Sequence, residues 1–423
     1  MAPTSRALPH VPLSDINLSN PEFWLQDRAW RYGAFKTLRD EDPYRFFEEW
    51  EFENSPIPRG PGYFALTRHD DIWHVSRHPE LFCSGKGSNI GDLTVELNEF
   101  FGSMINMDDP KHFRLRSIVS RGFAPREIKR VEEYVVSRAK IVVDDVLERF
   151  PGGQCDFVEE IASRFPLEII CEMMGIPESD YKQILTWTNT ILGVGDPELV
   201  TGLDDLLNAG LSMFNYAQAL GEDRIKNPVD DITSVMMQAE VDGERLTAQE
   251  FGSFFILLVV AGNETTRNAI SHGMKLLTDN PDQRKIWFDN FETHTKSAVE
   301  EIVRYATPVI HFRRTVTQDT DINGFPVKEG QKVVMWYASG NRDERVYTNP
   351  EMFDVRRDIQ PPQVGFGAGG PHFCLGANLA RREIAVMFDE IRRRLPTLQI
   401  TGEPAYLQSN FINGVKRMPC AFK

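Results

Sequence analysis

A cysteine closes the glycine-rich stretch Phe366-Gly367-Ala368-Gly369-Gly370-Pro371-His372-Phe373-Cys374-Leu375-Gly376, and the residues after it read as a helix as far as about Leu395. The positive end of a helix dipole and the unpaired N–H groups of its first turn stabilise a thiolate and lower its pKa. The glycines let the loop pass close to a flat ligand. The stretch therefore favours Cys374 as a functional thiolate.

Two other interpretations apply to a cysteine in this setting. A glycine-rich loop before a helix can cradle a phosphate, but such a loop ends in Lys-Ser or Lys-Thr within a βαβ unit, and neither feature is present here. A cysteine can also be a small buried hydrophobe, which suits Cys83, Cys155, Cys171 and Cys420. The five cysteines are scattered and odd in number, so their spacing predicts neither disulfides nor structural zinc.

The composition is that of an ordinary globular protein, with 423 residues, 41% of them hydrophobic and 26% charged. A net charge of -15 argues against nucleic acid or an anionic membrane as the main partner, because both require a clustered positive field. The segment Met1–Asn20 lacks the apolar core of a signal peptide, and no membrane span is expected. We therefore expect a cytoplasmic protein, and the absence of repeats or linkers predicts a single catalytic domain over residues 1–423.

Apolar periodicity predicts a mainly α fold with small peripheral β-sheets. Helical spacing dominates from about Pro110 to Asn280, and it is clear in Ile128–Phe150 and Glu159–Met174. Short strand-like segments lie towards the two ends of the chain, at Gly62–Thr67, Arg314–Val316, Val327–Trp336 and the C-terminal tail.

One long helix is expected in the interior. A capping box, Thr247 with Glu250 three residues later, starts it, and Asp279-Asn280-Pro281 ends it. Phe254–Ala261 is apolar on all faces, yet Gly262-Asn263-Glu264-Thr265-Thr266 follows directly and carries polar groups that are costly to bury. Either the helix emerges into solvent there or these groups form a site. A glycine in mid-helix favours the site, through close approach of a flat ligand or a local widening of the helix.

A further motif, Glu301 and Arg304, lies three residues apart on one helical face and by itself indicates only an exposed ion pair. The order of these motifs, from the helix with Ala261-Gly262-Asn263-Glu264-Thr265-Thr266 through this pair to the loop ending His372-Phe373-Cys374-Leu375-Gly376, resembles the cytochrome P-450 family across essentially the whole chain. The resemblance implies the family's triangular prism fold, with haem b between the long helix and the cysteine loop. It also implies a haem-thiolate monooxygenase that uses dioxygen and two electrons.

The resemblance assigns roles residue by residue. Cys374 becomes the axial ligand of the haem iron, a thiolate whose electron donation favours O–O cleavage. Thr265 and Glu264 become the catalytic pair that delivers protons to the oxygen side. The structural triad falls on Glu301, Arg304 and Arg357. The loop's phenylalanine, Phe366, stands one position earlier than is usual in the family. Gly370 matches a fixed position of the loop. The family's haem contacts fall on His112, Arg116, Arg314 (with Arg313 as the alternative), His372, Phe366, Gly376 and Ala261.

Three segments, Glu99–Ile105, Phe255–Asn268 and Phe411–Lys416, resemble the actinobacterial methyl-branched lipid ω-hydroxylases and steroid side-chain hydroxylases of this family. That resemblance implies hydroxylation of a terminal methyl group of branched lipids or of a cholesterol-type side chain. A terminal C–H bond is stronger than its neighbours, so ω-selectivity requires a narrow channel that admits only the chain end. The implied pocket residues are Phe101, Leu258, Val260, Ala261, Val309 and Phe411.

Several alternatives stay open. The hydrophobic substrate could be a terpenoid or a polyketide. A peroxygenase is a rival enzyme, although the Glu264-Thr265 pair favours the splitting of dioxygen. A haem-binding sensor or carrier without turnover is a rival from another class. The family also implies a ferredoxin and its reductase as electron partners, docking on the cysteine side where Arg114, Arg381 and Arg382 supply positive charge.

Overall fold

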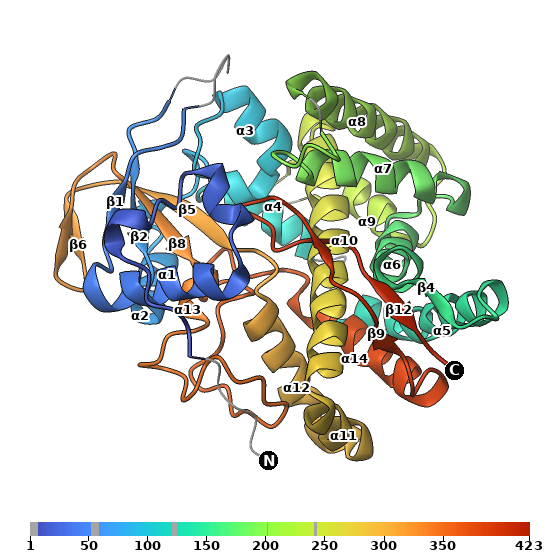
Figure 1. The fold of residues 1–423 in the computed structure, drawn as a ribbon. Helices are drawn as coiled ribbons and strands as arrows, with labels where there is room; N and C mark the ends of the chain where they lie inside the picture. Colours follow the sequence, from blue (N-terminus) through green and yellow to red (C-terminus); the bar gives the residue numbers. More distant parts are fainter. Residues whose placement is uncertain (1–6, 52–58, 121–124, 201, 241–242) are drawn as a thin grey trace. The chain divides into compact units, whose positions relative to one another are not determined.

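The computed structural model describes the chain except for residues 1–6, 52–58, 121–124, 201 and 241–242 (Figure 1). The chain forms two compact units, which are described separately. The first unit comprises Met1–Asp108, Glu300–Cys374 and Gln408–Asn413. The second comprises Asp109–Val299, Leu375–Leu407 and Gly414–Lys423. The prediction of a single domain over residues 1–423 stays a prediction.

The first unit is built on a five-stranded sheet in the order β1-β2-β8-β5-β3. Strand β5 runs antiparallel to β8 with His311 opposite Trp336, whereas β2 runs parallel to β8. All of β8 is buried, and Trp336 stacks on Trp24 at 5.5 Å between ring centroids. The elements are β1 Phe46–Phe47, β2 Tyr63–Leu66, β3 Phe82–Cys83, β5 His311–Val316, β6 Thr320–Ile322, β7 Phe325–Val327, β8 Lys332–Trp336, α1 Arg28–Glu41, α2 His69–Arg77, α3 Val95–Gly102 and α13 Tyr337–Gly340.

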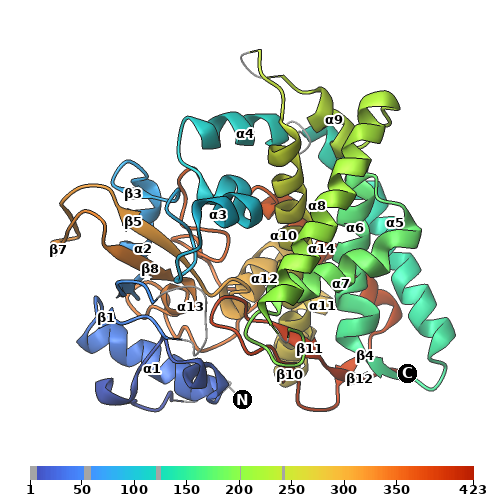
Figure 2. The ribbon, with the colours of Figure 1, turned by 90° about the horizontal axis from the view of Figure 1, so that it is seen from above.

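The second unit is mainly helical, and helix α10 packs against α6, α8 and α14 (Figure 2). Two small sheets accompany the helices, one of β4, β12 and β9 and one of β10 and β11. The elements are α4 Lys111–Ser120, α5 Pro125–Arg149, α6 Arg164–Met174, α7 Tyr181–Leu192, α8 Leu203–Lys226, α9 Ile232–Gln238, α10 Ala248–Asp279, α11 Pro281–Asp289, α14 Ala377–Arg394, β4 Gln154–Asp156, β9 Gln399–Ile400, β10 Ala405–Tyr406, β11 Val415–Arg417 and β12 Pro419–Ala421; α12, Phe291–Ala306, begins here and ends in the first unit.

The prediction for the long interior helix is confirmed. Thr247 accepts a hydrogen bond from the N–H of Glu250 while the Glu250 side chain accepts from the N–H of Thr247, so both halves of the capping box are present. Helix α10 then runs for 32 residues, and Pro281 opens the next helix because it has no N–H to continue the old one. Most of its side chains are buried, including those of Phe254, Phe255 and Val259.

Two boundary predictions were wrong. Val327–Trp336 was predicted as one strand, but β7 ends at Val327 and a turn with Gly330 at φ 83° precedes β8. The left-handed backbone that the turn requires is one that glycine adopts without strain. Glu159–Met174 was predicted as one helix, but a π-helical turn over Val158–Ala162 precedes α6.

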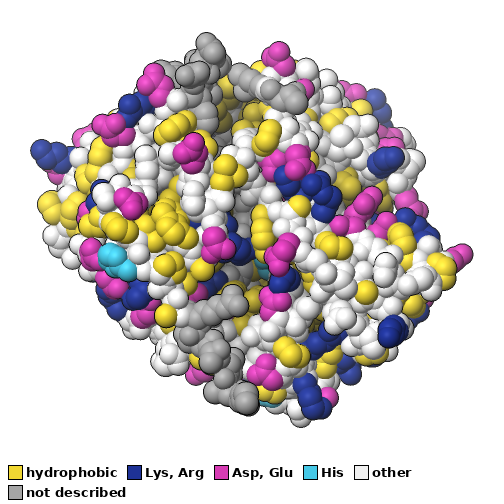
Figure 3. All heavy atoms as spheres, viewed as in Figure 1, with side chains coloured by type: hydrophobic (Ala, Val, Ile, Leu, Met, Phe, Trp, Pro, Cys, Tyr) yellow, Lys and Arg dark blue, Asp and Glu magenta, His cyan; other side chains and the backbone are white. Residues whose placement is uncertain are grey.

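No helix in the described part of the chain is both long and apolar enough to cross a bilayer. On the face drawn in Figure 3, Lys and Arg side chains are interspersed with Asp and Glu side chains.

Candidate active site

The cysteine loop is a set of tight turns within the first unit. Gly367, Gly369 and Gly370 have φ values of 90°, 77° and 76°, which glycine adopts without a Cβ clash. A Cβ on Gly370 would lie 2.1 Å from the carbonyl oxygen of Ser76 on α2, so the loop also packs closely on that helix. The N–H of Cys374 donates to the carbonyl of Phe366 at 2.9 Å. This bond fixes the backbone at Cys374, whose side chain is exposed, as is that of Phe373, while Phe366 and His372 are half-buried.

The two neighbouring arginines of β5, Arg313 and Arg314, have different surroundings. Arg313 is fully buried and forms an ion pair with Asp92 at 2.6 Å, and it also donates to the carbonyls of Gly87 and Ile90. Arg314 is also buried, and it donates one hydrogen bond, to the carbonyl of Arg313 at 2.8 Å. Burial lowers the pKa of Arg314, and Tyr337, Asp108 and Cys83 offset this in part, although no described carboxylate forms an ion pair with Arg314. Arg314 is therefore a buried cation whose charge is not balanced by an ion pair with a described carboxylate.

Glu301, Arg304 and Arg357 come together in the first unit. Nε of Arg304 donates to Oε2 of Glu301 at 2.7 Å, and Nε of Arg357 donates to Oε1 of the same carboxylate at 3.1 Å. Glu301 and Arg304 have no accessible surface, and Glu301 also accepts from the N–H of Asp354 at 3.0 Å. This arrangement joins α12 to the segment that carries Arg357. The buried charges of Glu301 and Arg304 are therefore both paired.

Helix α10 has an accessible stripe in the second unit. Leu257, Ala261 and Thr265 recur every four residues and keep accessible surface, although most of the helix around them is buried. Oγ1 of Thr265 donates to the carbonyl of Ala261 at 2.9 Å. The explanation of Gly262 by a local widening of the helix was wrong, whereas the explanation by a flat ligand stays a prediction. A Cβ on Gly262 would lie 3.1 Å from the side chain of Ile170 on α6, so the close neighbour is another helix, and α10 remains α-helical there.

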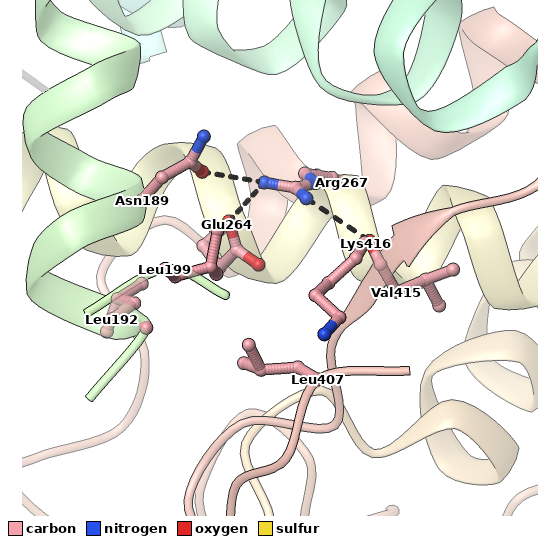
Figure 4. Close-up of a pocket in the computed structure, with 9 residues that line it drawn as sticks. Asn189, Leu192, Leu199, Glu264, Arg267, Leu407, Val415 and Lys416 are labelled. Atoms are coloured by element: carbon pink, nitrogen blue, oxygen red, sulfur yellow. Dashed lines mark hydrogen bonds and ion pairs between the residues drawn. The ribbon is translucent and has the colours of Figure 1, made fainter. Parts of the chain in front are cut away.

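Glu264 lies in a buried polar network rather than in open solvent (Figure 4). Its Oε2 accepts from Nη1 of Arg267 at 2.8 Å, and its Oε1 accepts from Nδ2 of Asn268 at 3.0 Å. Nη1 of Arg267 also donates to Oδ1 of Asn189 on α7 at 2.9 Å, and Nη2 donates to the carbonyl of Val415 on β11 at 3.1 Å. The network therefore connects α10, α7 and β11.

A small pocket borders this network, with room for about one water molecule. Glu264 and Arg267 form part of its wall, and Lys416 lies opposite (Figure 4). Nζ of Lys416 pairs with Asp196 at 2.8 Å. The Glu264 carboxylate therefore borders a space of about the size of one water molecule.

The remaining predicted residues are placed as follows. His112 and Arg116 lie one turn apart on α4, and Nδ1 of His112 is 3.2 Å from Oδ1 of Asp109. Leu258 and Val260 on α10 are buried. Phe101 lies in α3 against Phe100, with the ring planes at 89°. Val309 and Phe411 lie close together, because Val309 pairs with Ile412 and the carbonyl of Phe411 accepts from the N–H of Ile310.

Two buried charged residues, Arg267 and Glu383, were not predicted from the sequence. Arg267 stands three residues after Glu264, the same spacing as Glu301 and Arg304, so the signal was present in the sequence. Glu383 on α14 is buried, and burial raises its pKa well above the usual range, while Thr266 offsets part of that rise. The sequence shows Glu383 only as one more charged residue in Arg381-Arg382-Glu383, so nothing in it marks this side chain as buried.

Comparison with known proteins gives a consistent result. The cytochrome P-450 family model matches residues 293–397. The chain is 51% identical over 411 residues to the methyl-branched lipid omega-hydroxylase of Mycobacterium tuberculosis strain H37Rv, covering 97% of this chain and 95% of the relative. It is 40% identical over 430 residues to the steroid C26-monooxygenase of Rhodococcus jostii, covering 99% and 87%.

The fold agrees with a solved structure as well. A Mycobacterium marinum cytochrome P-450 in complex with pseudoionone superposes with a TM-score of 0.92 at 40% identity, covering 98% of this chain and 99% of that one. The prediction of a mainly α fold with small sheets is confirmed.

Proposed function

This chain belongs to the cytochrome P-450 family and is a monooxygenase, and from that premise we propose that it hydroxylates the terminal methyl group of methyl-branched lipids. The observation that carries the proposal is the 51% identity to a methyl-branched lipid omega-hydroxylase over 97% of the chain. A cholesterol-type side chain, which also ends in a branched methyl group, is the second candidate, and the 40% identity to a steroid C26-monooxygenase favours it.

The residues of this chain fit a haem group, and we propose that it is haem b. Arg314 is a buried guanidinium without a carboxylate partner among the described residues, which suits a propionate. Cys374 is an exposed cysteine at the end of a rigid loop, which suits the thiolate ligand of the iron. When bound, the haem iron supplies the oxygen activation of this enzyme class. The further proposed haem contacts are His112, Arg116, His372, Phe366, Gly376 and Ala261.

Thr265 and Glu264 are the proposed proton donors. The hydroxyl of Thr265 lies on the accessible stripe of α10, where it can accept a hydrogen bond from a bound ligand while it donates to the Ala261 carbonyl, and it can donate to the ligand after rotating away from that carbonyl. Glu264 points away from this stripe into the buried polar network, and its carboxylate forms part of the wall of the small pocket. Proton transfer by positioned side chains contributes about 10²–10⁴ to a rate. The pair favours a monooxygenase that splits dioxygen over a peroxygenase.

The substrate channel is proposed to be lined by Phe101, Leu258, Val260, Val309 and Phe411. A terminal methyl group is oxidised in preference to weaker internal C–H bonds only if the channel excludes the internal carbons from the iron. Aromatic rings supply such a constriction because they are large and rigid. Phe411 is held by ring contacts to His311 and Phe312, both at 5.5 Å between centroids.

An optical titration of the ferric protein tests the substrate class. Phytanic acid, a methyl-branched fatty acid, is compared with a straight-chain acid of the same main-chain length, and cholest-4-en-3-one is titrated in parallel. The proposal predicts a low-to-high-spin shift of the Soret band with the branched acid and a weaker one with the straight acid. A thiolate-type spectrum that none of the three moves would contradict the substrate class and leave the family assignment intact.

Electron delivery is proposed to come from a ferredoxin and its reductase. Arg114, Arg381 and Arg382 are the proposed contacts, because a basic area would offset the net charge of -15 for an acidic partner. Reversing the charge at Arg381 and Arg382 is expected to slow reduction and to weaken its salt dependence, measured by stopped flow. Unchanged reduction rates and an unchanged salt dependence would mean that the ferredoxin docks on another face of the protein.

A further inference from the structure

Two cysteines that lie far apart in the sequence face each other in the second unit. Cys155 on β4 and Cys420 on β12 are 265 residues apart, and their Sγ atoms are 3.5 Å apart. They are direct partners in the antiparallel register, with Gln154 opposite Ala421 and Asp156 opposite Pro419 on either side. Directly opposite residues of an antiparallel pair have Cα atoms about 4.5–5.5 Å apart, within the roughly 4.4–6.8 Å that a disulfide spans. The two sulfurs can therefore bond without a shift of the backbone.

The strand that carries Cys420 is held on both sides. Its other edge pairs with β9, where Cys420 lies opposite Ile400. Hydrogen bonds from Phe157 N–H to the Met418 carbonyl and from Phe422 N–H to the Gly153 carbonyl, each 2.8 Å, extend the β4 pairing beyond the strand itself. Cys155 is half-buried, whereas Cys420 is 2% exposed, so a small reagent reaches the pair past Cys155.

We propose that Cys155 and Cys420 are an oxidisable thiol pair, which a peroxide converts to a disulfide that fastens the C-terminal strand to β4. The two thiols are within hydrogen-bond distance, either can be the donor, and the bond favours the thiolate of the sulfur that accepts it. The proposal concerns a site outside the haem pocket, and it does not depend on the substrate class.

The chemistry balances with a peroxide as the two-electron oxidant. The thiolate of one cysteine of the pair attacks one oxygen of hydrogen peroxide, the O–O bond breaks, and the released hydroxide takes the proton of the other thiol to form water. The second thiolate then attacks the sulfur of the sulfenic acid and expels hydroxide, which a solvent proton converts to a second water. Two thiols are oxidised, and one peroxide is reduced. A monooxygenase can generate this reagent, because reduction of dioxygen by two electrons without substrate oxidation yields hydrogen peroxide.

The cross-link would constrain the chain segment that adjoins the buried polar network of Glu264 and Arg267. Strand β12 follows β11 directly, and the Val415 carbonyl on β11 accepts the hydrogen bond from Arg267. A covalent bond at Cys420 restricts the unfolded chain and opposes local opening of this C-terminal segment. The oxidised protein is therefore expected to melt at a higher temperature and to exchange the amide hydrogens of residues 415–421 more slowly.

The test uses the full-length holoprotein. Reduced protein is treated with hydrogen peroxide, quenched with catalase, alkylated under denaturing conditions and digested without reduction. The expected result is the loss of two of the five thiols and a peptide that joins Cys155 to Cys420 and is split by dithiothreitol. Melting and hydrogen exchange are measured on the same oxidised and reduced samples.

Cys155→Ser and Cys420→Ser should each abolish the cross-link and the gain in melting temperature, whereas the matched control Cys83→Ser should retain both. The peptide map of the wild-type protein still tests for the cross-link if a variant folds poorly. Recovery of Cys420 as alkylated thiol or as sulfinic acid, without the joined peptide, would overturn the proposal. So would a joined peptide whose formation leaves both the melting temperature and the exchange rates unchanged.

Discussion

Nη1 of Arg267 lies 2.8 Å from Oε2 of Glu264 and 2.9 Å from Oδ1 of Asn189, so a single nitrogen joins the proposed proton donor on α10 to helix α7. Nη2 of the same arginine donates to the Val415 carbonyl on β11. Arg267 is 8% exposed and Glu264 4% exposed, so the pair is largely shielded from solvent. The position of the Glu264 carboxylate is therefore set by residues from three separate parts of the chain.

The first prediction concerns this pair. Arg267→Met leaves the Glu264 carboxylate buried without its cation, and removal of one partner of a buried pair typically costs about 3–5 kcal/mol of unfolding free energy. Urea unfolding should show a loss of this order. In the double variant with Glu264→Gln much of the loss should be recovered, because no charge is then left unpaired. Purely additive effects in this cycle would mean that the two side chains are not coupled.

Thr265→Ala should uncouple electron consumption from hydroxylation. The variant lacks the hydroxyl that lies on the accessible stripe of α10, so product formation per NADPH should fall by about 10²-fold if the hydroxyl supplies the lower end of a proton-transfer contribution. Thr265→Ser keeps the hydroxyl and should retain most of the coupling. The measurement is product against NADPH consumed and peroxide released. Equal coupling in all three proteins would remove Thr265 from the proton path.

Glu383 should make stability depend on pH. Burial raises its folded pKa above the unfolded value of about 4.5, so the folded state binds more protons than the unfolded state wherever the two differ. Its contribution is fully present below the unfolded pKa and is lost as pH rises towards the folded pKa. Glu383→Gln should therefore flatten the decline of melting temperature above that unfolded value. Parallel curves for the wild type and the variant would contradict the assignment.

The two arginines of β5 should behave differently. Arg313→Met breaks the ion pair with Asp92 and should lower the unfolding free energy, whether or not haem is bound. Arg314→Met removes a cation that has no carboxylate partner among the described residues, so it should barely affect the apoprotein and should speed haem transfer to apomyoglobin. If instead Arg313→Met alone released haem faster, Arg313 would be the propionate ligand.

Cys374→Ser should abolish the thiolate signature of the ferrous carbon monoxide spectrum, because a hydroxyl is a far weaker electron donor than a thiolate. Cys83→Ser is the matched control and should keep the wild-type spectrum. A thiolate spectrum in Cys374→Ser would assign the iron ligand to another of the five cysteines.

The sequence alone determined the features that depend on near neighbours. The capping box at Thr247 and Glu250 and the extent of α10 follow from spacings of three and four residues, which a helix brings together whatever surrounds it. The pairing of Glu301 with Arg304 has the same origin. The order of motifs along the chain was sufficient for the family, and the comparisons confirm it.

Tertiary structure decided the features that depend on distant partners. Arg313 and Arg314 are adjacent on β5 and point to opposite faces, so only the packing around the strand shows which one has a carboxylate. Arg267 meets Asn189 and Val415 across 78 and 148 residues. Cys155 meets Cys420 across 265 residues, although their spacing predicted no disulfide. Such contacts are fixed by how helices and strands pack against one another, and no local propensity along the chain records that packing.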